Sequence, residues 1–418
     1  MAGKRSLTSL HIQSLFTENK PEDLEERLSP KLSPACKHFL PHAKVTPHRV
    51  NRFWKALGQS PHPDILDPWT AEHLESFHGN IENCIGSIKL PVGLAGPLRV
   101  NGLYAQGDYP VPLATSEAAL VASYHRGACM ISASGGCTSM LLYQAVNRAP
   151  AFAFDSIISA GKFVAWAMES FDSFQEIANA TTNHGKLVDV GTTVEGNHVY
   201  LNFEFTTGDA SGQNMVTIAT QAVCEFISAH SPVPIQRYYV EGNMSGDKKA
   251  SAQAYTSVRG RKVSAEVIIP PDILHKYVHA TPKQLIDYWQ ISAIGGVLSG
   301  TMGVQGHFAN GLAALYLATG QDAACVAESA IGVTRFELTD DGSLYASVSL
   351  PCIMIGTVGG GTSLPSQKAC LDLMNLSGSG KSGALAEVCA ALLLGGELSI
   401  IAALATGDFT RAHHKLAR

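Results

Sequence analysis

The clearest periodic pattern in the chain lies in its middle third, between residues 186 and 209. Apolar and polar positions alternate there, and the apolar ones are Val199, Leu201, Phe203 and Phe205. A period of two is typical of a β-strand that buries one face and exposes the other. The segment KLVDVGTTVEGNHVYLNFEFTTGD therefore predicts a half-buried antiparallel strand in a hairpin.

A helical period follows this hairpin directly. In ASGQNMVTIATQAVCEFI the apolar residues recur three and four apart, which predicts a buried helix face of Met215, Ile218, Ala219, Ala222, Val223 and Phe226. The segment PIQRYYV then predicts another strand. Strand, turn, helix and strand in this order indicate a compact α+β unit of the split β-α-β type, over roughly residues 149–240.

Two shorter segments carry helix-start signals. In NKPEDLEERL we expect Asn19 to cap a helix whose first turn holds Pro21 and acidic residues. In LATSEAALVASYHRG we expect Thr115 or Ser116 to cap a helix of about three turns that Gly127 ends. Between them, ENCIGSIKLPVGLAGPLRVNG is too rich in glycine and proline for a long helix and predicts turns.

The most apolar segment is ALAEVCAALLLGGELSIIAALATG, which is long enough to span a bilayer on length alone. It contains two carboxylates, Glu387 and Glu397. Charged groups are costly in lipid, whereas a protein interior can accommodate them. We therefore expect a core or interface helix, broken at its GG pair, that directs both carboxylates into the protein.

Composition narrows the class of protein. The 418 residues are 45% hydrophobic, enough for two or three structural units, but only 16% charged, against roughly 25% in soluble domains. Another subunit is therefore expected to cover part of the surface. The net charge of −5, without basic runs, makes nucleic acid and membrane poor partners. The nine cysteines include no CxxC pair, which predicts reduced thiols. The start of the sequence lacks the apolar core of a signal peptide, which predicts a cytoplasmic location.

A loop with the sequence EGNMSGDKKA combines flexible residues with adjacent charges. Because Lys248 and Lys249 repel each other, a solvated loop with Asp247 as partial neutraliser is the simplest interpretation.

Glycine-containing turns offer candidate anion sites. TGDASG lies at the predicted helix start, where free backbone N–H groups and the helix dipole favour an anion. GTVGGGTS lets a backbone approach a ligand closely, although a tight turn explains it equally well. NLSGSGKSG is not a P-loop, because Asn375 stands where that motif needs glycine, and no GxGxxG motif in a Rossmann context is present.

Seven motifs occur in a fixed order: ENCIGSIKLPVGLAGPL, LATSEAALVAS, GDASGQNM, GDKKAS, GQDAA, GTVGGGTSLPSQ and GELSIIAALATGDF. This series resembles the catalytic portion of the hydroxymethylglutaryl-coenzyme A (HMG-CoA) reductases. It is more similar to the form shared by eukaryotes and many archaea than to the bacterial form that degrades mevalonate, although the membrane anchor of eukaryotic members is not seen. The resemblance covers about four fifths of the chain, and the first 60 residues match weakly.

The resemblance implies a four-electron reduction of HMG-CoA to mevalonate. The thioester takes one hydride, coenzyme A leaves, and the resulting aldehyde takes a second hydride. By the same resemblance, Lys248 stabilises the oxyanion and Glu117 donates or relays a proton, while Asp322 bridges Glu117 and Lys248. His413 protonates the departing sulfur, since imidazole titrates near neutral pH.

Substrate contacts are implied for Arg148, Asn243, Asp247, Lys249 and Asn310. Two positions depart from the family pattern. Glu241 replaces the serine that commonly opens the SGN motif, and a carboxylate there repels the substrate's carboxylate unless it is turned away or paired with Arg148 or Lys249. Gln290 stands about where many members have a substrate-binding lysine. Affinity for the hydroxymethylglutaryl group is therefore open.

Cofactor contacts are implied for Thr182, Asn183, Lys186, Asp209, Gly212, Gln213, Asn214, Gly359, Gly360 and Gly361. GDASGQNM replaces the commoner GDAMGMNM and loses two methionines. The serine-arginine pair that usually binds the 2′-phosphate is replaced by Thr182 and Asn183, with Lys186 nearby. NADPH is expected, because a lysine can bind phosphate as a point charge, and NADH is the alternative. No metal is expected.

The resemblance thus implies an α/β (α+β) fold, in which a large mixed helical and sheet domain carries an inserted small ferredoxin-like (split β-α-β) nucleotide-binding domain. The expected parts are a helical segment (1–82), a large substrate-binding domain (83–148 and 250–418), a small domain (149–240) and a connecting catalytic loop (241–249). We expect a homodimer or homotetramer with the active site between protomers. Two alternatives remain: a catalytically idle coenzyme A-binding paralogue, and an acyltransferase that uses Cys129 or Cys137.

Overall fold

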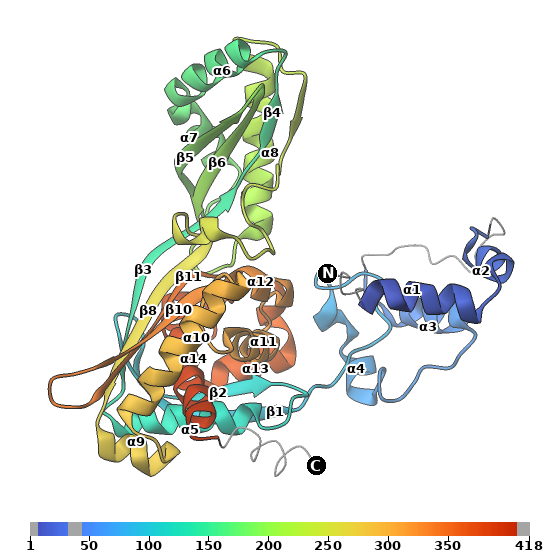
Figure 1. Cartoon of the computed structure of the whole chain (residues 1–418). Coiled ribbons are helices and arrows are strands. Elements are labelled where there is room, and N and C mark those ends of the chain that lie inside the picture. Colours follow the sequence, from blue (N-terminus) through green and yellow to red (C-terminus); the bar gives the residue numbers. More distant parts are fainter. Residues whose placement is uncertain (1–6, 32–43, 408–418) are drawn as a thin grey trace. The chain divides into compact units, whose positions relative to one another are not determined.

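The computed structural model describes residues 7–31 and 44–407, and its chain divides into two compact units, 1–87 and 88–418 (Figure 1). The first unit contains α1 (Leu7–Glu18), α2 (Pro21–Leu28), α3 (Pro47–Leu57), α4 (Pro68–Glu72) and the 3₁₀ turn η1 (Leu74–Phe77). Its small core forms where Val50 and Trp54 of α3 pack with Val45, Leu74 and Cys84. The Trp54 indole N–H donates to the carbonyl of Ile85 at 2.9 Å, which ties the end of this unit to α3.

The start of α2 corrects one sequence expectation. The helix begins at Pro21 as expected, but its N-cap residue is Lys20, and no side chain caps it. Asn19 instead belongs to the end of α1, where its side-chain amide donates to the carbonyl of Leu15 at 2.9 Å. Only Asn19 and Lys20 lie between the two helices, and Asn19 closes the first helix rather than opening the second.

The second unit is built on a mixed sheet. In its large part, β1 (Val92–Gly102) pairs with β2 (Gln106–Ala114) and runs parallel to β3 (Cys137–Arg148), and the order continues through β8 (Gly260–Ile269), β11 (Leu344–Ile353), β10 (Gly332–Leu338) and β9 (Gly303–Val304). β3 first pairs with β8 and then, over its last three residues, with β6. This one strand therefore belongs to both halves of the sheet.

The smaller half confirms the predicted split β-α-β unit. Its elements are β4 (Ala151–Ala153), α6 (Ile157–Glu169), α7 (Phe171–Ala180), β5 (Lys186–Glu195), β6 (His198–Thr206), α8 (Gln213–His230) and β7 (Arg237–Tyr239). Its four strands lie in the antiparallel order β7-β4-β6-β5, which is the ferredoxin-like arrangement. The alternating residues of β6 are buried as expected: Val199, Leu201, Phe203 and Phe205.

The buried face of α8 is only partly the predicted one. Ala219 and Val223 are buried, whereas Ile218 is 62% exposed. The face that packs is made of Val216, Ala219, Thr220, Val223, Cys224 and Ile227. Apolar residues occur on several sides of this helix, so the spacing alone could not distinguish neighbouring faces.

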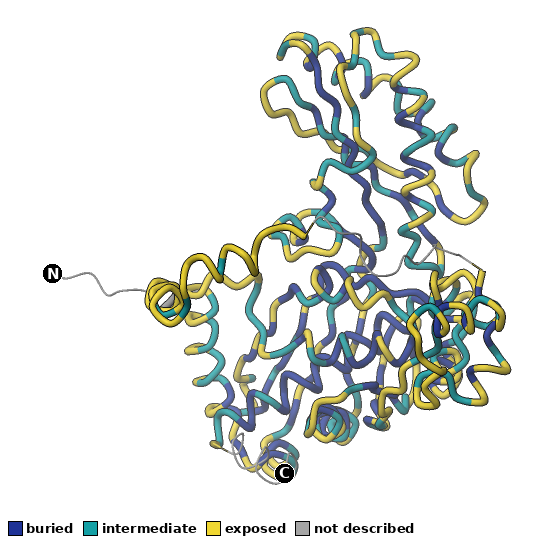
Figure 2. Tube along the Cα trace, turned by 90° about the vertical axis from the view of Figure 1, so that its right-hand side faces the viewer, coloured by how far each residue is buried: buried dark blue, intermediate teal, exposed yellow. Residues whose placement is uncertain are grey.

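α14 (Ser382–Thr406) is the core helix of the large part (Figure 1), and Figure 2 shows that buried residues fill the interior of this part. It packs against β1, β3, β8 and β11 and against α5 (Leu120–Ala133), α10 (Pro282–Ser299) and α11 (Phe308–Thr319). By length and composition it is one helix that could cross a membrane, yet 83% of its apolar window is buried inside the protein. This confirms the predicted core helix, with Glu387 and Glu397 both fully buried.

The predicted break at the GG pair is wrong, because α14 continues through Gly395 and Gly396. Both glycines serve packing. A Cβ at Gly127 of α5 would lie 1.9 Å from the carbonyl oxygen of Gly395, and one at Gly396 would lie 2.3 Å from the ring of Tyr124. The missing side chains let α5 and α14 approach closely, so Gly127 lies within α5 and does not end it.

The start of α5 also differs from the prediction. The helix begins at Leu120 after Ala119, which has a positive φ of 69°. The Thr115 hydroxyl accepts a hydrogen bond from the backbone N–H of Glu117 at 3.0 Å. Glu117 therefore lies in a turn before the helix and not in its first turn.

The remaining elements complete the large part: η2 (Ala252–Tyr255), α9 (Pro271–Val278), η3 (Ala323–Cys325), α12 (Val326–Ser329), η4 (Gly360–Ser363) and α13 (Pro365–Leu373). Gln290 is exposed on α10. The predicted boundaries of the large and small domains remain predictions.

The two carboxylates of α14 each hold a turn through backbone N–H groups. Glu387 accepts hydrogen bonds from Leu103, Tyr104 and Ala105 at the β1–β2 turn and from Leu141 of β3, at 2.8–3.1 Å. Glu397 accepts from the N–H groups of Gly306 and His307 and from the Thr334 hydroxyl, at 2.6–2.8 Å. Burial of both charges is tolerated because they are hydrogen-bonded.

We predict that Glu387→Gln lowers the free energy of unfolding by about 3 kcal/mol, measured by urea denaturation. An amide presents an N–H₂ group to donors that need acceptors, so at least one buried N–H loses its partner. Glu225→Gln on α8, where the carboxylate is exposed, is the matched control and should change stability little. A loss below about 1 kcal/mol would contradict the role of the Glu387 charge.

Candidate functional site

The loop at residues 241–250 presents Lys248 in an unusual backbone conformation. Lys248 and Asn243 have positive φ angles of 57° and 64°. Such angles are uncommon for residues other than glycine, and they are found where surrounding contacts impose them. The contacts that hold this loop belong to Asp247, the residue before Lys248.

Lys248 forms an ion pair with Asp322, with 2.9 Å between Nζ and the nearer carboxylate oxygen. Asp322 is held in turn by its other oxygen, which accepts from the backbone N–H of Ala324 at the start of η3. The hydrogen bond from Lys248 to Asp322, together with the charge of Asp322, raises the pKa of Lys248. The lysine is therefore a stable cation at neutral pH, and about half of it remains exposed for a ligand.

Asp247 lies between two buried arginines. Its carboxylate oxygens are 3.0 Å from Arg148 Nη1 and 2.5 Å from Arg259 Nη2. Burial alone would raise the pKa of Asp247, but the charges and hydrogen bonds of Arg259 and Arg148 outweigh burial and lower it. Lys249 donates to the Asp247 carbonyl at 2.9 Å, so its ammonium also stabilises the loop.

Arg148 also pairs with Glu241, at 3.3 Å between Nη1 and Oε2. This is one of the two pairings considered for the glutamate that departs from the family pattern. Arg148 Nε and Glu241 Oε1 are both buried without a hydrogen-bond partner among the described residues. Arg148 therefore binds two carboxylates, Asp247 and Glu241, through its Nη1 atom.

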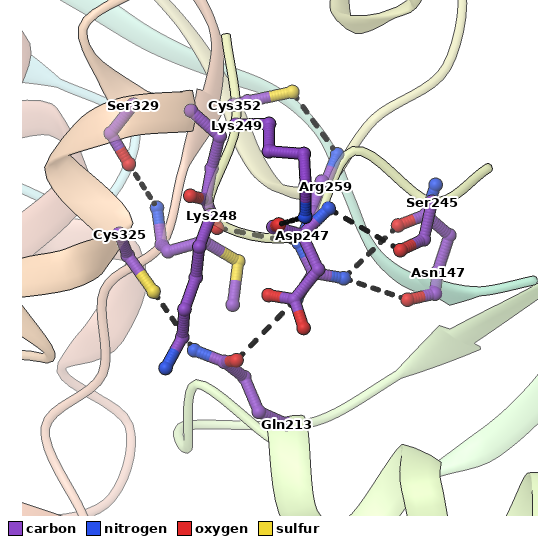
Figure 3. Close-up of polar contacts among 12 residues, drawn as sticks. Asn147, Gln213, Ser245, Asp247, Lys248, Lys249, Arg259, Cys325, Ser329 and Cys352 are labelled. Atoms are coloured by element: carbon purple, nitrogen blue, oxygen red, sulfur yellow. Dashed lines mark hydrogen bonds and ion pairs between the residues drawn. The ribbon is translucent and has the colours of Figure 1, made fainter. Parts of the chain in front are cut away.

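Arg259 is a residue of the site that the sequence analysis missed. Its side chain is 3% exposed and contacts Asp247, Glu328, Asn147 and Gln213 (Figure 3). The only available signal was its position in VRGRKV, just before a strand, and nothing in that spacing shows which residues it meets. Burial is the first cause of a raised pKa at Glu328, which the charge of Arg259 partly offsets.

Glu117 belongs to a second group of polar residues, near the start of α11. Its carboxylate accepts from the Asn310 side-chain amide at 3.2 Å. His307, one turn earlier, was also missed by the sequence analysis. Its ring stacks on Tyr124 at 5.4 Å between centroids, and its Nδ1 lies 3.4 Å from Glu397. Burial, followed by the charge of Glu397, raises the pKa of Tyr124 well above its usual range.

These two groups are not connected by direct polar contacts. None of the hydrogen bonds or ion pairs found among residues 7–31 and 44–407 joins Glu117 to Asp322 or Lys248. Asp322 therefore makes one half of the bridge expected from the resemblance. His413 lies outside the described residues, and its role remains a prediction.

The candidate cofactor residues from three segments gather around the start of α8. Gly212 precedes the helix with a φ of 76°, and a Cβ there would lie 2.2 Å from Thr207. The loop with Thr182 and Asn183, which leads into Lys186 of β5, is close by, since a Cβ at Gly185 would lie 2.3 Å from Met215. The third segment approaches at Gly356, whose Cβ would lie 2.7 Å from the Ser211 nitrogen.

Gly359 and Gly360 follow this approach point and have open space around them. Both have positive φ angles, and an added Cβ would meet nothing within 4 Å. Asn214, in the first turn of α8, is exposed. The helix start and the open glycines give backbone N–H groups access to a ligand, as an anion site requires.

Asp209 has a contact inside the protein. Its carboxylate accepts from the backbone N–H groups of Gly380 and Ser382 at the start of α14. Burial opposes ionisation, but these hydrogen bonds outweigh it and lower the pKa of Asp209. The glycine-rich segment before α14 thus binds a carboxylate of the chain itself, which agrees with the rejection of a P-loop.

The two candidate acyltransferase thiols are poorly activated. Cys137 is fully buried, and burial raises its pKa to about 12. Cys129 lies 3.6 Å from His125 on the preceding turn of α5, a neighbour that the sequence analysis did not consider, yet burial raises its pKa too. Neither environment favours the thiolate that nucleophilic catalysis needs.

We predict that Asp322→Asn lowers the pKa of Lys248, so the ammonium loses its proton at lower pH. NMR titration of protein carrying ¹³Cε-labelled lysine would measure this. Asp287→Asn is the matched control, because Asp287 pairs with Lys283 on the exposed surface of α10 at 2.7 Å. An unchanged Lys248 titration in Asp322→Asn would show that the ion pair does not set its protonation.

Comparisons with known proteins identify the family. The family model described as hydroxymethylglutaryl-coenzyme A reductase matches residues 53–418. The chain is 42% identical over 344 residues to the 3-hydroxy-3-methylglutaryl-coenzyme A reductase of Methanocaldococcus jannaschii, covering 81% of this chain and 85% of that relative. The Haloferax volcanii enzyme of the same name is 41% identical over 350 residues, covering 82% and 86%.

Solved structures agree on the fold. The class II 3-hydroxy-3-methylglutaryl-CoA reductase from Streptococcus pneumoniae, described as bound to NADPH in open conformations, superposes with a TM-score of 0.65 at 20% sequence identity. The similarity covers 86% of this chain and 97% of that one. The family model over residues 53–418 and the archaeal relatives at 41–42% identity show that the chain belongs to the hydroxymethylglutaryl-coenzyme A reductase family.

Proposed function

We propose that this chain reduces 3-hydroxy-3-methylglutaryl-CoA to mevalonate and coenzyme A, with NADPH as the reductant, and so feeds isoprenoid synthesis. The observation that carries the proposal is the ion pair of Lys248 with Asp322, in a loop that Asp247 anchors between two buried arginines. The names of the archaeal relatives and the description of the Streptococcus pneumoniae structure support the substrate and the cofactor.

Lys248 provides the electrostatic part of the mechanism. Reduction of the thioester and reduction of the aldehyde each place negative charge on the oxygen of the same carbon. A fixed ammonium within hydrogen-bond reach of that oxygen stabilises both transition states. Asp322 keeps Lys248 protonated and limits its movement.

The remaining site residues bind substrate and move protons. Glu117, held by Asn310, supplies or relays the proton that each developing alkoxide takes up. Arg148, held by Asp247 and Glu241, is the cation that we assign to the substrate. Asn243, Asp247 and Lys249 shape the loop around it, and His413 would protonate the leaving thiolate.

The residues around α8 fit a dinucleotide. NADPH supplies the hydride for each of the two reductions. The N-terminus of α8 suits the pyrophosphate, and the open Gly359 and Gly360 permit close backbone approach. Lys186 is exposed on the adjacent β5 and is the cation that we assign to the 2′-phosphate. Without the arginine that the family commonly has there, NADH remains a second candidate.

We further propose that the active site is completed by a second protomer, in a homodimer or homotetramer. In one chain the Glu117–Asn310 pair and the Lys248–Asp322 pair form separate groups. Large apolar side chains are exposed along α10, including Ile291, Val297 and Leu298. Both features are expected of a chain whose site and surface are completed by another copy.

A cytoplasmic location forms part of the same proposal. The longest apolar helix, α14, is accounted for by the core. Eight cysteines of the described residues are free, as in a reducing compartment.

The direct test incubates the protein with 3-hydroxy-3-methylglutaryl-CoA and either NADPH or NADH while absorbance and free thiol are followed. We expect two cofactor molecules to be oxidised per thiol released, and Lys248→Ala to slow reduction of both thioester and added mevaldehyde by about a hundredfold or more. Lys283→Ala, on the exposed surface of α10, is the control. Thiol release without cofactor oxidation would favour an acyltransferase. Binding of the substrate without turnover would favour a catalytically idle paralogue.

The shared-site proposal predicts complementation between two inactive variants. When Glu117→Gln and Lys248→Ala are co-expressed with different tags, mixed dimers contain one intact site, and activity should recover to about a quarter of the wild-type value. Lys248→Ala with Asp322→Asn is the control, because those two residues act within one chain and should not complement. Inactive mixed dimers in the first pair would place Glu117 and Lys248 in the same protomer's site.

A further inference from the structure

The side chain of Gln213 is engaged inside the protein, although it begins the helix that the nucleotide is expected to meet. Gln213 is the first residue of α8 and is half-buried. Its amide oxygen accepts from Arg259 Nη2 at 3.4 Å, and its amide nitrogen donates to Cys325 Sγ at 2.9 Å (Figure 3). In the commoner GDAMGMNM motif a methionine stands here, which can neither donate nor accept in this way.

The contact with Arg259 completes the hydrogen bonding of a buried guanidinium. Arg259 has five N–H donors. Nε donates to Glu328, Nη1 to the carbonyl and the side-chain oxygen of Asn147, and Nη2 to Asp247 and Gln213. Without Gln213 one donor loses its acceptor in a place with little access to water. The same guanidinium then holds Asp247, and through it Lys248, less firmly.

The contact with Cys325 links Gln213 to the segment that carries Asp322, the acidic partner of Lys248. Cys325 is fully buried and follows Asp322 by one turn of η3. Burial, followed by the charges of Glu328 and Asp322, raises the pKa of its thiol far above the usual value, so the sulfur remains neutral and can accept from the Gln213 amide. The Gln213 amide thus contacts Arg259, which supports Lys248 through Asp247, and also contacts Cys325, which follows Asp322 in η3.

We propose that Gln213 is a positioning residue that links the first turn of α8 to the Lys248–Asp322 pair, so that the nucleotide-binding helix and the oxyanion-stabilising cation keep a fixed relation. This inference rests on the proposed function, because it assigns the hydride donor to the α8 side and the developing oxyanion to Lys248. It also separates Gln213 from residues that bind the cofactor directly.

The kinetic test uses Gln213→Met, which places the commoner family residue at this position. We expect kcat to fall about tenfold for both the thioester and mevaldehyde, while the dissociation constant of NADPH, measured by its fluorescence, changes less than twofold. Gln221→Met is the matched control, since that amide lies on the same helix and contacts only Glu225 among the described hydrogen bonds. A raised dissociation constant with unchanged kcat would make Gln213 a cofactor contact and overturn the proposal.

A second readout does not depend on turnover. Acetylation of Lys248 by a succinimidyl ester, mapped by peptide mass spectrometry, reports how firmly Asp322 holds this ammonium. We expect Gln213→Met to label Lys248 about threefold faster than the wild type or Gln221→Met, with unchanged labelling of Lys283. Equal labelling in all three proteins would overturn the link. If the wild type fails to reduce 3-hydroxy-3-methylglutaryl-CoA, the proposed function is wrong. The labelling result would still test whether Gln213 supports the Lys248–Asp322 pair.

Discussion

The constraint on which most of the large domain depends is the burial of two carboxylates on one apolar helix. Glu387 and Glu397 are fully buried on α14, and such charges are tolerated only where hydrogen-bond donors surround them. The chain supplies backbone N–H groups from the β1–β2 turn, from β3 and from the loop before α11. These segments must therefore meet α14 in fixed places.

The contacts of these buried carboxylates also position residues of the candidate site. Glu397 fixes the backbone at His307, and α11 begins at the next residue, so the position of Asn310 follows from the same contact. Asn310 then holds Glu117. Because a backbone N–H group is removed only by substitution to proline, a carboxylate fixed by such groups is a durable reference point for a site that lies one helical turn away. The Lys248 loop is held in the complementary way, by a buried arginine, Arg259, whose hydrogen bonds reach acceptors on four residues from separate segments.

Sequence patterns predicted what depends on local periodicity and on family motifs. The β6 alternation, the split β-α-β unit and the apolar core helix were expected correctly, since each leaves a repeated mark along the chain. The predictions of a helix break at Gly395 and of a helix end at Gly127 were wrong. Both glycines allow two neighbouring helices to pack closely and do not interrupt their own helix. The predicted buried face of α8 was also partly wrong, because tertiary packing determines which of its several apolar sides is buried. Arg259 and His307 were missed because most of their partners are far away in sequence: Asn147 and Glu328 for Arg259, and Glu397 for His307.

The junction between the two halves of the sheet follows the same physical rule. Arg261 is fully buried, and burial lowers its pKa to about 10. Its guanidinium donates to the carbonyls of Gly208 and Ile355 and to the Ser382 hydroxyl. Gly208 lies in the turn before α8 and Ser382 begins α14, so this one cation joins that turn to the core helix. The Asp209 carboxylate joins the same two places from the other direction. Two opposite charges therefore hold the turn before α8 to the start of α14, and a movement of the small domain that separated them would leave both charges without their present partners.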